Sequence, residues 1–167
     1  NPSGVGTRAA TQDRISAVTY NGANEVTGWT WANGQSYQRG YDMLGRLSSY
    51  PLGNPNGNGN AAGLLRTLGY DDAGRITGYT HTQAGVATPT LDQTFSYDDL
   101  GQLTSSTQNT TSYGYGYDAS GNRTLRVVGA QSYPQTIAPT NNRLTQSQDL
   151  NGVVTLNYDN AGNLLND

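Results

Sequence analysis

The chain has no cysteine and no lysine, and it has a single histidine among its 167 residues. The lack of thiols excludes disulfides, thiolate metal sites and cysteine nucleophiles. The nine arginines are scattered along the chain, so the sequence offers no basic surface for a nucleic acid. No apolar run approaches the roughly 18 residues that a membrane-spanning helix needs, and we therefore expect no membrane span.

Aliphatic residues are also scarce. Leu, Ile, Val and Phe together make up 27 of the 167 residues, a share below the roughly 20% of ordinary globular chains. The net charge is only −3, so disorder is not favoured. Gly, Thr, Asn, Ser and Gln form half of the chain, and this composition suits strands and tight turns better than helices. It predicts an all-β fold without a thick aliphatic core.

A repeated pattern is the main signal. The pattern Tyr-Asp-x-x-Gly occurs five times, at spacings of 29, 27, 20 and 41 residues, and begins at Tyr41, Tyr70, Tyr97, Tyr117 and Tyr158. The last spacing is about two periods of 20, which predicts a degenerate copy that starts on Ala138. A second weak copy starts on Tyr20. We therefore predict about seven repeats over residues 15–167, and an irregular or partial repeat in residues 1–14.

Equivalent positions in the seven repeats, compared one at a time, predict the local structure of the repeat. The residue four after the tyrosine position is always Gly or Asn, the two residues that best accept a positive φ. An Asp at the first turn position accepts hydrogen bonds from nearby backbone N–H groups. Asp-x-x-Gly thus predicts a type I turn with a left-handed last residue, between two strands. The Gly/Asn column consists of Asn24, Gly45, Gly74, Gly101, Gly121, Asn142 and Gly162.

The residue six after the tyrosine position is aliphatic in six of the seven repeats, as in Leu47 and Leu103. Apolar residues that alternate with polar ones indicate half-buried strands. Each repeat is therefore expected to be strand, tight turn, strand, and the chain a repetitive antiparallel β-hairpin meander. The two longer spacings are expected to be absorbed by loop insertions around residues 51–63 and 81–93.

The charged residues of the repeat offer little chemistry. The doubled carboxylates Asp71-Asp72 and Asp98-Asp99 could serve as metal ligands or acid–base groups, but turn capping explains the repeat aspartates better. Three repeats have an arginine at the fifth residue after the tyrosine position, next to the aliphatic sixth residue. Neighbouring residues of a strand point to opposite faces, which favours solvated or lumen-facing cations. They are Arg46, Arg75 and Arg143.

His81 lies in the second expected insertion, so we expect an exposed loop side chain, and no nucleophile or base pairs with it by spacing. The sequence therefore predicts no catalytic residue, no cofactor-binding residue and no metal ligand, and a protein that is not an enzyme. Tyr113, Tyr115 and Tyr117 lie on one strand face, and Trp29 and Trp31 are also two residues apart. Exposed, these rings could stack on a sugar or another ligand; burial in the sheet is favoured.

Three segments resemble a known family. Tyr41–Ser48 and Tyr70–Thr77 look like RHS (YD) repeats, and Tyr117–Thr124 resembles a common variant. The family includes bacterial Rhs polymorphic toxins, the C components of insecticidal toxin complexes, wall-associated proteins and animal teneurins. The resemblance implies a curved or spiralling β-sheet that closes into a hollow shell. In the toxins of the family the shell encloses a C-terminal toxic domain.

The chain also departs from this family. It has no Asp-Pro, whereas family toxins carry a core-associated Asp-Pro-x-Gly segment and a self-cleavage site beyond the last repeat. We therefore expect a fragment of a larger shell, or a subunit that meets identical copies edge to edge.

The expected function is structural, as part of a secreted or surface-exposed bacterial shell that encapsulates and delivers a C-terminal toxin or effector. The expected partners are neighbouring RHS repeats and an encapsulated toxin domain. The alternative is a cell-surface YD-repeat protein that binds carbohydrate or a partner, or self-assembles into a fibre.

Overall fold

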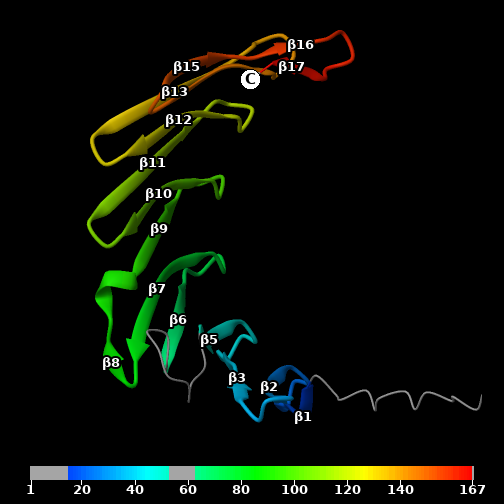
Figure 1. The fold of residues 1–167 in the computed structure, drawn as a ribbon, viewed down its shortest axis with the longest axis vertical. Coiled ribbons are helices and arrows are strands. Elements are labelled where there is room, and N and C mark those ends of the chain that lie inside the picture. Colours follow the sequence, from blue (N-terminus) through cyan, green and yellow to red (C-terminus); the bar gives the residue numbers. More distant parts are fainter. Residues whose placement is uncertain (1–14, 53–62, 167) are drawn as a thin grey trace, which may run out of the picture. The chain divides into compact units, whose positions relative to one another are not determined.

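The computed structural model describes residues 15–52 and 63–166, and it is almost entirely antiparallel β-structure. The sequence prediction of the fold class is therefore confirmed. The expected irregular segment 1–14 lies outside the described residues. In the described part of the chain, the only helical element is the single 3₁₀ turn η1 (Pro89–Leu91). Figure 1 shows the strands in chain order.

The strands are short, as expected for a chain with a turn about every ten residues. They are β1 (Ile15–Tyr20), β2 (Val26–Trp31), β3 (Ser36–Gln38), β4 (Gly40–Tyr41), β5 (Leu47–Pro51), β6 (Leu64–Tyr70), β7 (Ile76–Gln83), β8 (Val86–Ala87), β9 (Gln93–Tyr97), β10 (Leu103–Gln108), β11 (Thr111–Tyr117), β12 (Arg123–Val128), β13 (Gln131–Ile137), β14 (Leu144–Asp149), β15 (Gly152–Thr155), β16 (Asn157–Tyr158) and β17 (Leu164–Asn166).

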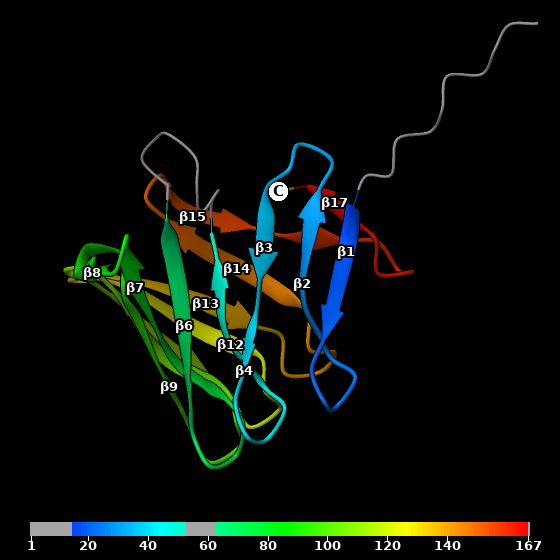
Figure 2. The ribbon, with the colours of Figure 1, turned by 90° about the horizontal axis from the view of Figure 1, so that it is seen from below.

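The chain divides into two compact units, and the division falls within β6 and β7. The described part of the first unit consists of residues 15–52, 63–68 and 81–88. Its strands β1, β2 and β3 lie side by side in one antiparallel sheet (Figure 2). In the same unit β4 pairs with β5, and β5 pairs with β6. The end of β7 pairs with β8, with Thr82 opposite Ala87.

The second unit consists of residues 69–80 and 89–166 of the described chain. Its sheet has the order β7-β9-β10-β11-β12-β13-β14-β15, so that consecutive strands are neighbours apart from β8. The hairpin of β16 and β17 forms a separate two-stranded sheet. This is the expected meander, because each short turn returns the chain alongside the strand it has just left.

The register shows how the repeats correspond. The tyrosine of a repeat lies opposite the residue six positions later, as for Tyr97 and Leu103 or Tyr117 and Arg123. In the degenerate repeat, Ile137 lies opposite Leu144, seven residues later. The prediction that Ala138 holds the tyrosine position is therefore wrong by one residue, and Ile137 holds it. The reason is a turn that is one residue longer, closed by a hydrogen bond of 2.8 Å from the N–H of Ala138 to the carbonyl of Arg143.

Few side chains are fully covered. Among the described residues, only Leu64, Tyr133 and His81 have large side chains that are buried, and most strand residues are half-buried. In a single sheet, each side chain is covered only by the side chains of adjacent strands, and the remainder of its surface is exposed to solvent. The second expected insertion is partly wrong as well, because β7 continues through Gln83 and β8 returns against it.

Candidate functional site

The repeated turn is the feature with the most regular geometry, and we call the segment from the tyrosine to the residue after the glycine the YD turn. In the turn after Tyr97, the N–H of Asp98 donates to the carbonyl of Gln102 at 3.0 Å. The N–H of Gly101 donates back to the carbonyl of Asp98, also at 3.0 Å. This closed loop places Gly101 at φ 81°. All seven predicted Gly/Asn positions have positive φ, so this prediction is confirmed.

The aspartate side chain completes the turn. Oδ1 of Asp118 accepts the backbone N–H groups of Ser120 and Asn122, both at 2.9 Å. Its Oδ2 accepts Nδ2 of Asn122, also at 2.9 Å. Oδ1 and Oδ2 are used in the same way by the residue four positions later in three further pairs, which are Asp42 with Arg46, Asp71 with Arg75, and Asp159 with Asn163. The turn-capping interpretation of these aspartates is therefore confirmed.

These hydrogen bonds lower the pKa of four turn carboxyls below the ordinary value of 3.8. In two repeats the largest cause is the backbone N–H of the arginine four residues later, and its guanidinium adds to it. In the other two, the largest cause is the side-chain amide of the asparagine at the same position. The carboxylates are thus ionised hydrogen-bond acceptors at neutral pH. They belong to Asp42, Asp71, Asp118 and Asp159.

In four repeats the tyrosine hydroxyl joins the repeat to the preceding one. The hydroxyl of Tyr97 donates to the carbonyl of Ile76 at 2.8 Å, and that of Tyr117 donates to the carbonyl of Leu103 at 2.9 Å. Tyr41 and Tyr158 make the equivalent bonds of 2.9 Å to Val26 and Leu144. The accepting residue is always the aliphatic residue that follows the preceding turn. The period-two pattern predicts tyrosine only as an apolar strand residue. Tyr rather than Phe in all five full repeats is the signal that indicates a use for the hydroxyl.

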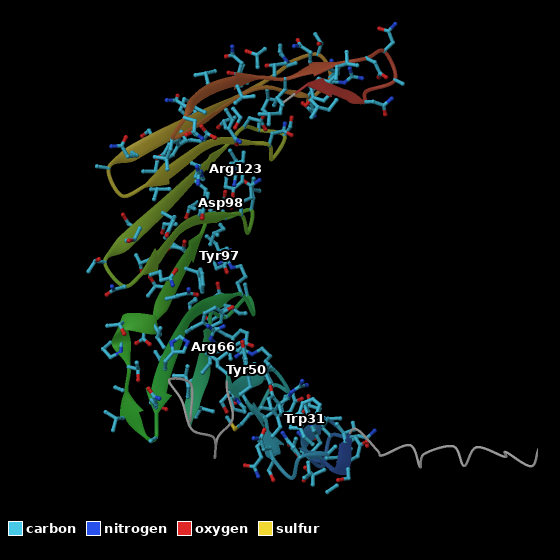
Figure 3. All side chains as sticks on the ribbon, viewed as in Figure 1. Trp31, Tyr50, Arg66, Tyr97, Asp98 and Arg123 are labelled. Atoms are coloured by element: carbon cyan, nitrogen blue, oxygen red, sulfur yellow. The ribbon has the colours of Figure 1, made fainter. Side chains whose placement is uncertain are left out.

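The arginine after the glycine joins repeats as well. Nε of Arg75 forms an ion pair of 2.7 Å with Asp71, and Nη1 donates to the carbonyl of Asp98 at 3.0 Å. Its guanidinium lies 5.0 Å from the ring centre of Tyr97, within the range of a cation–π contact. Arg143 makes the same kind of contact with Tyr158 at 5.4 Å. These contacts show that Arg75 and Arg143 are not simply solvated cations, whereas a lumen-facing orientation stays a prediction. Figure 3 shows Tyr97 and Asp98, which Arg75 contacts.

His81 contradicts the sequence prediction of an exposed loop side chain. It lies in β7 and is 2% exposed. Nε of Arg66 donates to its Nε2 at 3.0 Å, and Nη1 of Arg66 donates to the hydroxyl of Tyr50 at 3.2 Å. The prediction failed because β7 extends into the expected insertion, where β8 pairs with it and the N–H of Thr88 donates to the carbonyl of His81.

The two aromatic clusters have different surroundings. The ring of Trp29 stacks on Tyr37 at 4.2 Å and meets Trp31 edge-on at 5.5 Å. Trp31 is 42% exposed, so the favoured burial is wrong for this ring. Tyr113, Tyr115 and Tyr117 are all half-buried on β11. The guanidinium of Arg39 lies 5.0 Å from the ring centre of Trp29, within the range of a cation–π contact.

The described residues contain no group of three or more His, Asp or Glu side chains that could hold a metal ion. Asp72 and Asp99, the second members of the doubled pairs, are exposed in the turns. Within residues 15–52 and 63–166, no helix has the length and hydropathy needed to cross a membrane.

Comparison with known proteins identifies the repeat. The geometry above defines a repeat protein built of antiparallel hairpins that are joined through their YD turns. Residues 94–132, which contain the turns after Tyr97 and Tyr117, match the model of the family described as RHS Repeat. This segment therefore matches RHS repeats, and the resemblance found in the sequence is confirmed. No curated protein matches the chain.

Solved structures show the same fold. A chain of the Tc holotoxin pore of Photorhabdus luminescens, which carries a mutation in TccC3, matches with a TM-score of 0.67 and 18% identity over 92% of this chain. The crystal structure of TcdB2-TccC3-TEV matches with a TM-score of 0.68 and 17% identity over 88% of this chain. The complex TcdB2-TccC3-Cdc42 matches with a TM-score of 0.63, 18% identity and 90% coverage. This chain spans only 9–10% of the length of these chains.

Proposed function

We propose that the chain is a structural segment of a β-sheet shell that encloses and delivers a C-terminal toxin or effector. The observation that supports this most is the link from the tyrosine hydroxyl of one repeat to the backbone of the preceding repeat. Such a link is the same at four junctions, so hairpins can be added one after another to extend a wall. The shared fold with chains of Tc toxin complexes supports the same role.

Containment needs no reactive side chain. We propose that no residue of this chain is catalytic, because the repeat aspartates are occupied as caps and His81 accepts a hydrogen bond from Arg66. The wall would act by surrounding a cargo chain and keeping it apart from the solvent. The working environment under this proposal is outside the producing bacterial cell, as a secreted or surface-bound assembly.

The open strands suggest the immediate partners. In the described part of the chain, β1 pairs with β2 alone and β15 pairs with β14 alone. An unpaired strand edge presents backbone N–H and C=O groups that another strand can satisfy. We propose that further RHS repeats, of the same or an identical chain, cover these edges.

The test uses the complete product of the gene. Limited proteolysis with and without denaturant should show a segment downstream of residue 167 that resists cleavage until the shell opens, and electron microscopy should show a hollow particle. A gene product that ends at residue 167, or a downstream segment that is cleaved equally fast under both conditions, would contradict the encapsulation role.

One observation favours a second candidate, a surface protein that binds carbohydrate. Trp31 is exposed and lines a hollow of about 490 Å³ together with Asn33 and Gln35. An exposed indole beside amide side chains suits the face of a sugar ring. Glycan-array binding by the chain that disappears in Trp31→Ala, and not in Tyr20→Ala at another exposed ring, would support this candidate.

A further inference from the structure

A hollow of about 450 Å³ lies in the second unit, where the degenerate repeat follows the repeat of Tyr117. Its lining includes Tyr117, Arg123, Gln135, Ile137 and Leu144. The volume is within the range of small-molecule sites in proteins. Figure 3 labels Arg123, the first residue of β12, whose side chain lines the hollow.

The other junctions show what is missing here. Where a repeat begins with tyrosine, the ring lies on the preceding repeat and its hydroxyl donates to a backbone carbonyl, as Tyr117 does to Leu103. In the degenerate repeat this place belongs to Ile137, whose side chain is shorter and has no hydroxyl. The carbonyl that corresponds to that of Leu103 is the carbonyl of Arg123. No side chain of the described residues donates to it.

Neighbouring groups are suited to an aromatic ring. At complete junctions a guanidinium lies over the tyrosine ring, as Arg75 does over Tyr97. At this junction the preceding repeat has Asn122 in place of that arginine, and Arg123 supplies a guanidinium one residue later. Nε of Arg123 donates to Oε1 of Gln135 at 3.1 Å, which holds the guanidinium beside the hollow. Ile137 and Leu144 add apolar surface.

We propose that this hollow receives the side chain of a tyrosine from another polypeptide. The phenol ring packs against Ile137, Leu144 and the guanidinium of Arg123, and its hydroxyl donates to the carbonyl of Arg123. We name tyrosine as the occupant because four other junctions hold a tyrosine side chain through the same hydrogen bond from its hydroxyl to a backbone carbonyl. An extended segment can present such a side chain to a single-layered sheet, so an unfolded cargo chain would be a suitable source. This last step rests on the proposed shell function, whereas phenol binding itself depends on the second unit alone.

The first experiment uses p-cresol, the analogue of a tyrosine side chain, with the whole chain. Titration followed by methyl NMR should shift the methyl signals of Ile137 and Leu144, with cross-peaks to the ring protons of the ligand. Toluene lacks the hydroxyl, so it should bind about fivefold more weakly, the ratio given by roughly one kcal/mol for a net hydrogen bond. Equal binding of the two ligands, or no cross-peaks to these methyl groups, would overturn the proposal.

A pair of variants tests the site from within. Ile137→Tyr places the missing ring at the equivalent ladder position and should abolish p-cresol binding. Ile137→Val leaves the hollow open and should keep binding within about twofold, because it changes one methylene. If Ile137→Tyr folds and still binds p-cresol as the native chain does, the site is elsewhere. The cross-peaks in the native chain decide the matter if this variant does not fold.

A third arm separates a polypeptide from a free phenol. The peptide Gly-Tyr-Gly should bind at least as tightly as p-cresol and should shift the same methyl signals, whereas Gly-Phe-Gly should be weaker by about fivefold. Binding of p-cresol together with exclusion of Gly-Tyr-Gly would contradict a polypeptide occupant. These results are independent of encapsulation, so their failure and the failure of the shell proposal are distinguishable.

Discussion

At the scale of single residues, glycine, aspartate and tyrosine stabilise the YD turn by different physical means. Glycine accepts a left-handed backbone that other L-residues adopt only with strain. Aspartate satisfies backbone N–H groups that the tight turn leaves without carbonyl partners. Tyrosine acts outside its own turn, because its hydroxyl reaches the preceding repeat. Each contribution can therefore be removed separately.

Gly74 tests the backbone contribution alone. It has φ +80°, and a Cβ added there would meet no atom within 4 Å. Gly74→Ala should therefore lower the free energy of unfolding by about 1–2 kcal/mol through backbone strain. The matched control is Gly22→Ala, which also has open space but no positive φ. Its effect should stay within about 0.5 kcal/mol. Equal unfolding midpoints in urea for the two variants would contradict the turn geometry.

The aspartate caps predict a pH dependence. The folded-state pKa of Asp118 lies below its ordinary value of 3.8, so the unfolded chain binds more protons as the pH falls through this range. The stabilisation is therefore complete above about pH 5 and is lost as the pH falls through the folded-state value. Urea unfolding followed at several pH values between about 6 and 2 measures this loss.

Asp118→Asn is the control, because the amide keeps an acceptor oxygen but does not titrate. It should have a smaller acid-induced loss of stability than the native chain. A native chain whose stability is unchanged, or rises, on acidification would show that these caps do not stabilise the fold.

Tyr97 tests the link between repeats. Tyr97→Phe keeps the ring and removes the hydrogen bond to the carbonyl of Ile76. It should reduce the free energy of unfolding by about 1 kcal/mol. Tyr115 is half-buried, and its hydroxyl has no partner among the described residues. Tyr115→Phe should therefore be close to neutral, and the same loss in both variants would mean that the hydroxyl bond contributes nothing specific.

At the scale of elements, the turns and the period-two pattern were sufficient to predict the hairpins. The positions of the turns were predictable because only Gly or Asn fits the left-handed residue, as at Gly101 and Asn142. Two element boundaries were not predictable. The slip from Ala138 to Ile137 follows from an extra turn residue, which only the ladder pairing shows. The extension of β7 over His81 depends on β8, a two-residue strand with no distinct sequence signal.

His81 is the test of that extension. His81→Ala removes a buried ring that accepts a hydrogen bond from Arg66. It should destabilise the first unit by about 2 kcal/mol or more, since it leaves a cavity and removes a buried acceptor. Thr80→Ala, at the exposed neighbouring position in β7, should have little effect. Thermal unfolding curves that coincide for the two variants would restore the exposed-loop interpretation.

At the scale of the whole molecule, the sequence predicted the RHS repeat because its signal is local and repeated. Links between repeats were harder to predict, since they join residues 14 to 23 positions apart, such as Tyr117 with Leu103 and Arg75 with Asp98. The hollow beside Ile137 could not be foreseen for the same reason. It results from one missing tyrosine together with the pairing that places Ile137 in its position.

The central claim is that this chain is a segment whose sheets continue into neighbouring repeats. Analytical ultracentrifugation of the 167-residue chain over a wide concentration range tests it most directly. Because β1 pairs with β2 alone and β15 with β14 alone in the described part of the chain, the other side of each strand should recruit further strands. The predicted result is self-association that increases with concentration and is reduced by a proline placed at Val153 in β15, whose N–H points away from β14. A chain that stays monomeric at every concentration would contradict the claim.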